Sequence, residues 1–350
     1  MQPVAVRILH PTGGSNAGPL ALALADARAA NAERLAALFR AHGAVDVRIE
    51  SGDRQAPSFG EHLRGLLDGI QDPGGLVVLG SGSIPLATTA DITAFVEIAG
   101  SGARRALANN FYSADVIAVG EASALAAVPD LANDNALPRW LAEEAGFEVE
   151  DLRRRWRLAI DLDSPLDVAL IGGDVAETDT GAVAQRLAAI RSLVLDPRAE
   201  LVVAGRTSAA TLRWLERRTA SRTRALVEER GLRTISLVGS DRRSQRPPRS
   251  VLGLLIDGRG PESLGSVLAE LGDAAVIDTR VLLAHRLGAD ESAWPAAEDR
   301  FGSDLLLVDR IADPWLRSLS SSARDASIPV LLGGHTLVGP ALRLAIGRGR

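Results

Sequence analysis

Short aliphatic runs alternate with longer helical patterns along the first half of the chain. The aliphatic runs predict strands at Val4–Leu9, Val45–Ile49, Leu76–Leu79 and Asp115–Val119. The stretches between them predict helices at Leu20–His42, Phe59–Ile70, Thr89–Ile98, Leu137–Ala145 and Pro165–Leu170. Thr88 or Thr89 can cap the third of these helices, with Asp91 in its first turn. Strands separated by helices are typical of βαβ units in a mostly parallel sheet.

The second half repeats this alternation. Strands are predicted at Leu201–Ala204, Ile235–Val238, Val251–Ile256, Ala275–Ile277, Leu305–Val308 and Val330–Leu332. Helices are predicted at Ala182–Leu195, Ser208–Arg218, Pro261–Leu271 and Pro314–Ala323. Because 350 residues exceed the usual size of one hydrophobic core, we predict an α/β protein with two αβα domains and mostly parallel sheets. The first covers residues 1–172 and the second residues 173–350, with the boundary near the acidic stretch Gly172–Thr180.

Composition narrows the chemistry and the partners. Cysteine is absent, and all 39 basic residues are arginine, which excludes thiolate chemistry, a Schiff-base lysine and a P-loop lysine. A net charge of −5 gives no reason to expect a nucleic-acid partner. The N-terminus lacks the basic and apolar regions of a signal peptide, and the uncharged stretch Gly74–Ala90 is interrupted by Gly, Ser and Pro. We expect a cytoplasmic protein without a membrane partner; the sequence leaves a homo-oligomer open.

Three predicted strands run into small-residue turns that open helices. These turns are Gly80–Ser81–Gly82–Ser83, Gly205–Arg206–Thr207–Ser208 and Gly333–Gly334–His335–Thr336. Glycine lets backbone amides approach an anion, and ligands bind at the carboxyl ends of parallel strands. A phosphorylated small molecule is therefore the expected ligand of at least one turn, although each alone also reads as an ordinary tight turn. Arg206 adds a guanidinium to its turn, and the arginine-rich stretch Arg213–Arg249 is either a phosphate-binding or a plain solvated surface.

Two further polar segments are candidates for chemistry. Asp161 and Asp163 alternate along an extended segment, as Mg²⁺ binding favours, but Ser164, Pro165 and Asp167 also read as the start of a helix. Asn109 and Asn110 precede the only tyrosine and can contact a base or a sugar. They can equally satisfy the backbone of their own loop.

The order of these motifs in residues 1–172 resembles the MobA-like nucleotidyltransferases, which have the nucleotide-diphospho-sugar transferase fold. The resemblance rests on three segments: Ile8–Ser15 at the place of the glycine-rich phosphate loop, Gly80–Thr88 at the place of a GxDxPL motif, and Asp161–Asp167 at the place of an (I/V)DTPxD-like element. It implies that Gly13, Gly14 and Ser15 bind nucleotide phosphates and that Asp163 binds Mg²⁺. The chain departs from the family in two places. Ser83 stands where the family has a metal-binding Asp, and the loop lacks the usual Arg and Lys.

Three hypotheses follow for the function. The chain is a Mg²⁺-dependent nucleotidyltransferase in which Asp163, supported by Asp161, holds the metal and Asn109 or Asn110 contacts the acceptor or the base. Alternatively, it binds a nucleotide or sugar phosphate without catalysis. In the third, the active site lies in the second domain around Arg206 and His335.

Overall fold

The computed structural model describes residues 1–11, 17–52, 58–70, 74–175, 178–228 and 248–347. These residues form two compact units. The first contains residues 1–11 and most of 25–162, and the second contains residues 17–24, most of 163–228 and residues 248–347. The chain thus divides between Leu162 and Asp163, ahead of the stretch Gly172–Thr180 in which we placed the boundary.

A six-stranded sheet forms the centre of the first unit. Its strands are β1 (Val4–His10), β2 (Asp46–Ser51), β3 (Gly75–Gly80), β4 (Arg105–Ala108), β5 (Val116–Val119) and β6 (Glu148–Asp151). They lie in the order β2-β1-β3-β5-β4-β6. Strand β5 pairs antiparallel with both neighbours, whereas the other pairs are parallel. The sheet is therefore mixed: five strands share one direction and β5 alone runs against them.

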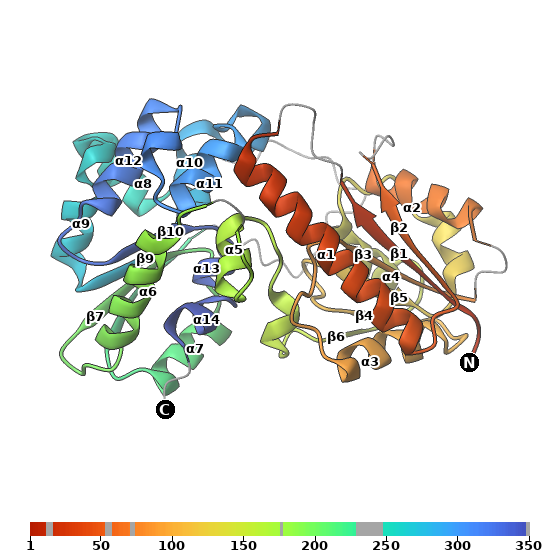
Figure 1. Cartoon of the computed structure of the whole chain (residues 1–350). Coiled ribbons are helices and arrows are strands. Elements are labelled where there is room, and N and C mark those ends of the chain that lie inside the picture. The colour runs from red at the N-terminus through yellow and green to blue at the C-terminus, as the bar shows by residue number, and fades with distance from the viewer. Residues whose placement is uncertain (12–16, 53–57, 71–73, 176–177, 229–247, 348–350) are drawn as a thin grey trace. The chain divides into compact units, whose positions relative to one another are not determined.

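Helices cover both faces of this sheet (Figure 1). They are α2 (Phe59–Asp68), α3 (Thr89–Ala99), α4 (Leu137–Glu143) and the part of α1 (Pro19–Ala41) that begins at Ala25, since its first residues belong to the second unit. On one face, Val6 and Ile8 of β1 pack in one apolar cluster with Leu35 of α1 and Phe95 of α3. On the other face, a second cluster joins the sheet to residues of α2 and α4, including Leu63 and Leu141. Successive residues of a strand such as β1 thus pack against helices on opposite faces of the sheet.

The second unit has a four-stranded, fully parallel sheet in the order β10-β9-β7-β8. Its strands are β7 (Glu200–Gly205), β8 (Arg222–Val227), β9 (Ala274–Asp278) and β10 (Val330–Gly333). Its helices are α5 (Pro165–Leu170), α6 (Gly181–Leu193), α7 (Ala209–Arg218), α8 (Val251–Arg259), α9 (Leu264–Leu271), α10 (Thr279–Leu287), α11 (Ala297–Asp304), α12 (Pro314–Arg324), α13 (His335–Val338) and α14 (Leu342–Ile346). Residues of α8, α9, α10 and α12 share one apolar cluster with the strands.

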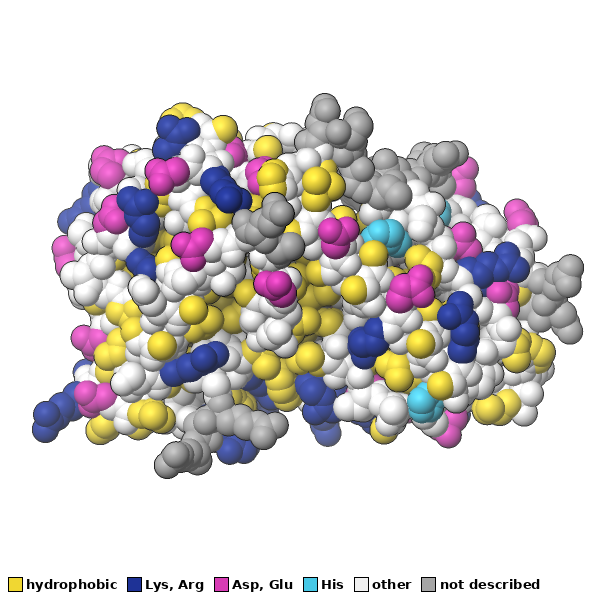
Figure 2. Space-filling model, in the orientation of Figure 1, with side chains coloured by type: hydrophobic (Ala, Val, Ile, Leu, Met, Phe, Trp, Pro, Cys, Tyr) yellow, Lys and Arg dark blue, Asp and Glu magenta, His cyan; other side chains and the backbone are white. Residues whose placement is uncertain are grey.

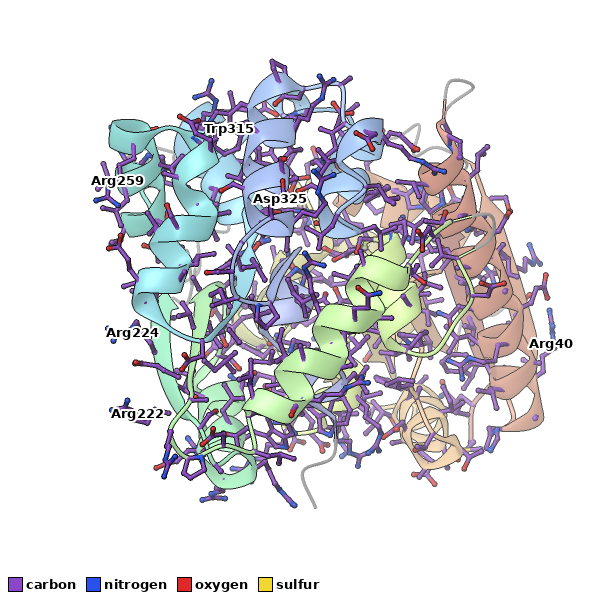
Figure 3. The ribbon with its side chains drawn as sticks, turned by 60° about the vertical axis from the view of Figure 1, so that its left-hand side comes forward. Arg40, Arg222, Arg224, Arg259, Trp315 and Asp325 are labelled. Atoms are coloured by element: carbon purple, nitrogen blue, oxygen red, sulfur yellow. The ribbon has the colours of Figure 1, made fainter. Side chains whose placement is uncertain are left out.

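Strand β8 is an edge of this sheet, and its alternate residues Arg222 and Arg224 extend outward (Figure 3). Arg224 pairs with Glu200 at 3.0 Å. Charged side chains on an edge strand disfavour its pairing with another chain.

The α/β class is confirmed, but two predicted strands are wrong. Val251–Ile256 lies in helix α8, whose first turn is capped by the Ser250 hydroxyl accepting from the Gly253 amide at 3.1 Å. A short, uniformly apolar run does not distinguish a strand from a buried helix. Leu305–Val308 forms no strand because Leu306 has a φ of +59°, which an extended strand excludes. The predicted strand Ile235–Val238 lies outside the described residues.

No helix in the described ranges combines the length and the apolar character needed to cross a bilayer. On the face drawn in Figure 2, acidic and basic side chains are interspersed over the surface.

Candidate functional site

Many polar loop residues of the first unit lie where the parallel strands of its sheet end, which we call the carboxyl edge of the sheet. Because β1, β2, β3, β4 and β6 run in one direction, their carboxyl ends share this edge, and the reversed β5 begins there. Ligands of α/β proteins bind at such an edge, where loops rather than strands determine the surface.

A cavity of about 280 Å³ lies at this edge, over the ends of β1, β2 and β3. One part of its wall is apolar and includes Leu9, Phe59, Val78, Leu79, Ile117 and Leu137. The polar part includes His10, Glu50, His62, Asp115, Asn133 and Asp134. An apolar wall with a few convergent polar groups is the usual composition of a small-molecule site.

Two of the polar residues are held by partners on neighbouring strands. His10 Nδ1 lies 3.0 Å from Ser81 Oγ, which joins the ends of β1 and β3. Glu50 Oε1 lies 3.4 Å from Nε of Arg7, a β1 residue that is 1% exposed and also contacts Asp46 at 2.6 Å. Since a buried cation needs nearby carboxylates, the Arg7 guanidinium holds the Glu50 carboxylate in place.

Asp115 is fixed by the loop that connects β4 to β5. The Asn109 side chain donates to Asp115 Oδ2 at 2.8 Å and accepts from the Asp115 amide at 3.0 Å. Asn109 is 1% exposed, and Asn110 accepts from the Tyr112 amide at 3.0 Å. In this conformation both asparagines satisfy their own loop, which was one of the two interpretations of the sequence. Contact with a base or an acceptor stays a prediction.

The Gly80–Ser83 turn meets the Asp161 segment directly. Ser83 and Asp161 form an isolated antiparallel bridge, and the Leu162 amide donates to the Gly82 carbonyl at 3.0 Å. A Cβ on Gly82 would lie 2.7 Å from Asp161 Oδ1, so this glycine admits the neighbouring segment. Ser81 and Ser83 are at most 2% exposed. The two sequence motifs therefore lie together, and the contacts that join them are contacts with each other.

Gly13, Gly14 and Ser15 lie outside the described residues. The helix that follows them is described, and its first turn already has an anionic partner. Both oxygens of Glu298 accept from the Leu20 amide at 3.2 Å, and one also accepts from the Ala21 amide. A carboxylate thus occupies the amides to which an anionic ligand would bind.

In the second unit, the turn after β7 is closed by an ion pair. Arg206 binds the carboxylate of Asp278 through Nε at 2.7 Å and Nη2 at 3.1 Å. Asp278 is fully buried and Arg206 about one-quarter exposed. Thr207 is buried, and Ser208 caps helix α7 by accepting from the Thr211 amide at 3.1 Å. The described contacts of this turn are therefore those of a structural junction.

A second buried pair lies beside it, on residues that the sequence did not single out. Arg280 binds Asp304 through two nitrogens, one of them at 2.6 Å. Burial would lower the pKa of Arg280, but the charge and hydrogen bond of Asp304 and the charges of Asp278 and Asp167 together raise that pKa. Arg206 and Arg280, which both lie near the carboxyl ends of β7 and β9, thus have carboxylate partners.

Asp163 and His335 approach each other in the second unit. Their Oδ2 and Nδ1 atoms are 3.8 Å apart, and each side chain is a little under half exposed. Asp167 caps helix α5 together with Ser164, and its Oδ2 also accepts from the Asp163 amide at 3.1 Å. Burial, and then the charge of Asp163, raises the pKa of Asp167 to about 8. The helix-start interpretation of this segment is confirmed.

The carboxylate oxygens of Asp161 and Asp163 supply only part of the ligand set that Mg²⁺ needs. Asp163 can offer an exposed oxygen, whereas Asp161 Oδ1 already accepts from the Leu162 amide at 2.9 Å. Within the described ranges, no three His, Asp or Glu side chains gather around one point. Since Mg²⁺ needs six oxygen ligands, a bound phosphate and water would have to complete its shell.

The fold and this site define an α/β protein with a polar-rimmed cavity at the carboxyl edge of a mixed sheet. No family model matches the chain, and no curated protein matches it either.

Proposed function

We propose that the chain is a nucleotidyltransferase-like protein that binds the nucleoside of a nucleoside triphosphate in the cavity of the first unit. The observation that carries the proposal is the cavity itself. Its apolar wall suits the face of a base, and its carboxylates and histidines can bond to ribose hydroxyls and base amino groups. The strand–turn–helix order that resembles MobA-like proteins supports the same ligand class.

The charge of the lining decides which part of the nucleotide enters. Glu50, Asp115 and Asp134 line the cavity, and none of the described residues that line it is an arginine. Carboxylates repel phosphates, so the nucleoside end belongs inside and the phosphates outside. In the proposed reaction, an oxygen of a small phosphorylated or sugar acceptor attacks the α-phosphorus. The bond to the β-phosphate breaks, and pyrophosphate leaves.

Binding without transfer is the alternative, and Ser83 favours it. Its buried hydroxyl donates to the Asp115 carbonyl at 3.0 Å, so this position offers no carboxylate for a metal. Dependence on Mg²⁺ therefore distinguishes nucleotidyl transfer from binding without transfer. Stabilisation by a triphosphate that requires Mg²⁺ and is lost in Asp163→Ala supports transfer, and metal-independent stabilisation supports the binder.

The cavity is tested by thermal shift with the four common nucleosides and their triphosphates. We expect at least one nucleoside to stabilise the chain, and Glu50→Gln to weaken its binding about tenfold. Glu121→Gln is the matched control. Glu121 also pairs with an arginine, Arg104, and is 36% exposed against 39% for Glu50, but it does not line the cavity. Absence of any nucleoside effect, or equal loss in both variants, would refute the proposal.

A further inference from the structure

The other half of the same sheet edge carries arginines and the only tyrosine. Strands β4 and β6 end there, followed respectively by the loop of Tyr112 and by the segment of Arg153 and Arg154. Both arginines are exposed, and Tyr112 is half-buried. This half therefore differs in charge from the carboxylate-lined cavity beside it.

The Arg153 guanidinium lies over the Tyr112 ring, with its central carbon 5.0 Å from the ring centroid. Arg139 of α4 also lies over this ring, at 5.9 Å, and Phe111 meets it edge to face at 5.3 Å. The Asn110 side chain fixes the backbone of Tyr112. A guanidinium stacked on an aromatic face keeps its in-plane N–H groups available for a planar or tetrahedral anion.

From this arrangement we propose that Tyr112 and Arg153, with the exposed Arg154 next to it in sequence, form a phosphate-binding subsite next to the cavity. The inference rests on the proposed function for its context, because the subsite supplies cations for a phosphate and none of the described cavity-lining residues is an arginine. The group that binds there is a phosphate. This phosphate belongs either to the triphosphate of the nucleotide or to a second, phosphorylated substrate.

An internal carboxylate limits this subsite. Asp151 Oδ2 lies 2.5 Å from Arg153 Nε, and its side chain is 17% exposed. A phosphate must therefore compete with Asp151 for the guanidinium. Removing the charge of Asp151 should strengthen phosphate binding, whereas removing the charge of Arg153 should weaken it.

The single tyrosine makes a direct test possible. The whole chain labelled with 3-fluorotyrosine gives one protein ¹⁹F resonance, which is titrated with inorganic pyrophosphate at constant ionic strength. We expect a saturable shift, an affinity at least tenfold weaker in Arg153→Gln, and a tighter affinity in Asp151→Asn. Arg104→Gln is the matched control: Arg104 is also an exposed, carboxylate-paired arginine, but it precedes β4 and lies at the opposite edge.

Two further titrations identify the source of the phosphate. If the triphosphate occupies the subsite, ATP, GTP, CTP or UTP shifts the resonance and pyrophosphate competes with it. If a second substrate does, glycerol phosphate still shifts the resonance when the nucleotide is saturating. No saturable shift with pyrophosphate, or equal shifts in wild type and Arg153→Gln, would overturn the subsite. Neither result depends on nucleoside binding, which the thermal-shift experiment measures separately.

Discussion

Gly205 and Asp278 lie so close together that no side chain fits between them. A Cβ built on Gly205 would be 2.2 Å from Cβ of Asp278, and Gly205 has a φ of +128°. The glycine that ends β7 thus permits the partly buried Arg206–Asp278 pair to form. Its role in the turn is close packing, which the sequence alone does not distinguish from the binding of an anion.

Gly205→Ala should destabilise the second unit by about 2 kcal/mol or more, because it adds both backbone strain and a steric clash. Gly288→Ala is the control. Its φ of +91° is also in the left-handed region, but no atom lies within 4 Å of the added Cβ. We expect this control to cost about 1 kcal/mol. Urea denaturation followed by tryptophan fluorescence measures both, and equal losses would contradict the packing role.

Asp167 should make the second unit less stable as pH rises. Because its pKa of about 8 is above the unfolded value of 3.8, its contribution is fully present below pH 4 and is lost as pH rises toward 8. The expected loss is about 1.4 kcal/mol for each pH unit between these two values. Asp167→Asn keeps an oxygen acceptor and should flatten this dependence. Denaturation at pH 5 and pH 8 tests it, and identical slopes in wild type and variant would exclude Asp167 as the cause.

Asp91 should act in the opposite direction. Burial would raise its pKa, but hydrogen bonds from Thr88 and the Arg155 guanidinium hold the pKa below its usual range. Its stabilising effect is present above about pH 4 and is lost as pH falls through the lowered pKa. Asp91→Asn should therefore cost about 1–3 kcal/mol at pH 7. The difference from wild type should shrink near pH 3; a constant difference would contradict the ionic role.

Asn109→Ala should destabilise the first unit more than Asn110→Ala does. Asn109 is buried and bonds to Asp115 and to the Leu158 carbonyl, whereas Asn110 is half-buried and accepts from Tyr112. We expect roughly 2–3 kcal/mol for the first and about 1 kcal/mol or less for the second. Thermal denaturation with circular dichroism compares them. Similar costs would mean that the Asn109 bonds do not hold the loop.

Most of the fold was predictable where periodicity and flanking residues agreed. The predicted helix cap at Thr88 is present, with Asp91 completing the reciprocal bonds. Strands β4, β6 and β8 were missed because their sequences, RALA, EVED and RTRALV, are short or charged rather than continuously aliphatic. The reversal of β5 has no local signal, since it depends on which strands pair.

The residues that line the cavity could be predicted only in part from the sequence. His10 and Glu50 lie in the last two residues of β1 and β2, and Asp115 directly precedes β5. A systematic search for polar residues at strand ends would have found them. That these particular ends meet follows from strand order, which pairwise long-range contacts determine. Conversely, the Ser81, Ser83 and Thr207 hydroxyls fit an anion-binding motif in sequence but are buried.

The single reversed strand also determines how this surface can change. Because β5 runs against its neighbours, the connection from β4 leaves the edge and returns to it within the few residues between Asn109 and Asp115. The side-chain and backbone bonds between those two residues close the connection at its base. Substitutions between them can therefore change the shape and charge of this surface while the register of the sheet is kept, which makes this short hairpin the natural place to vary the surface.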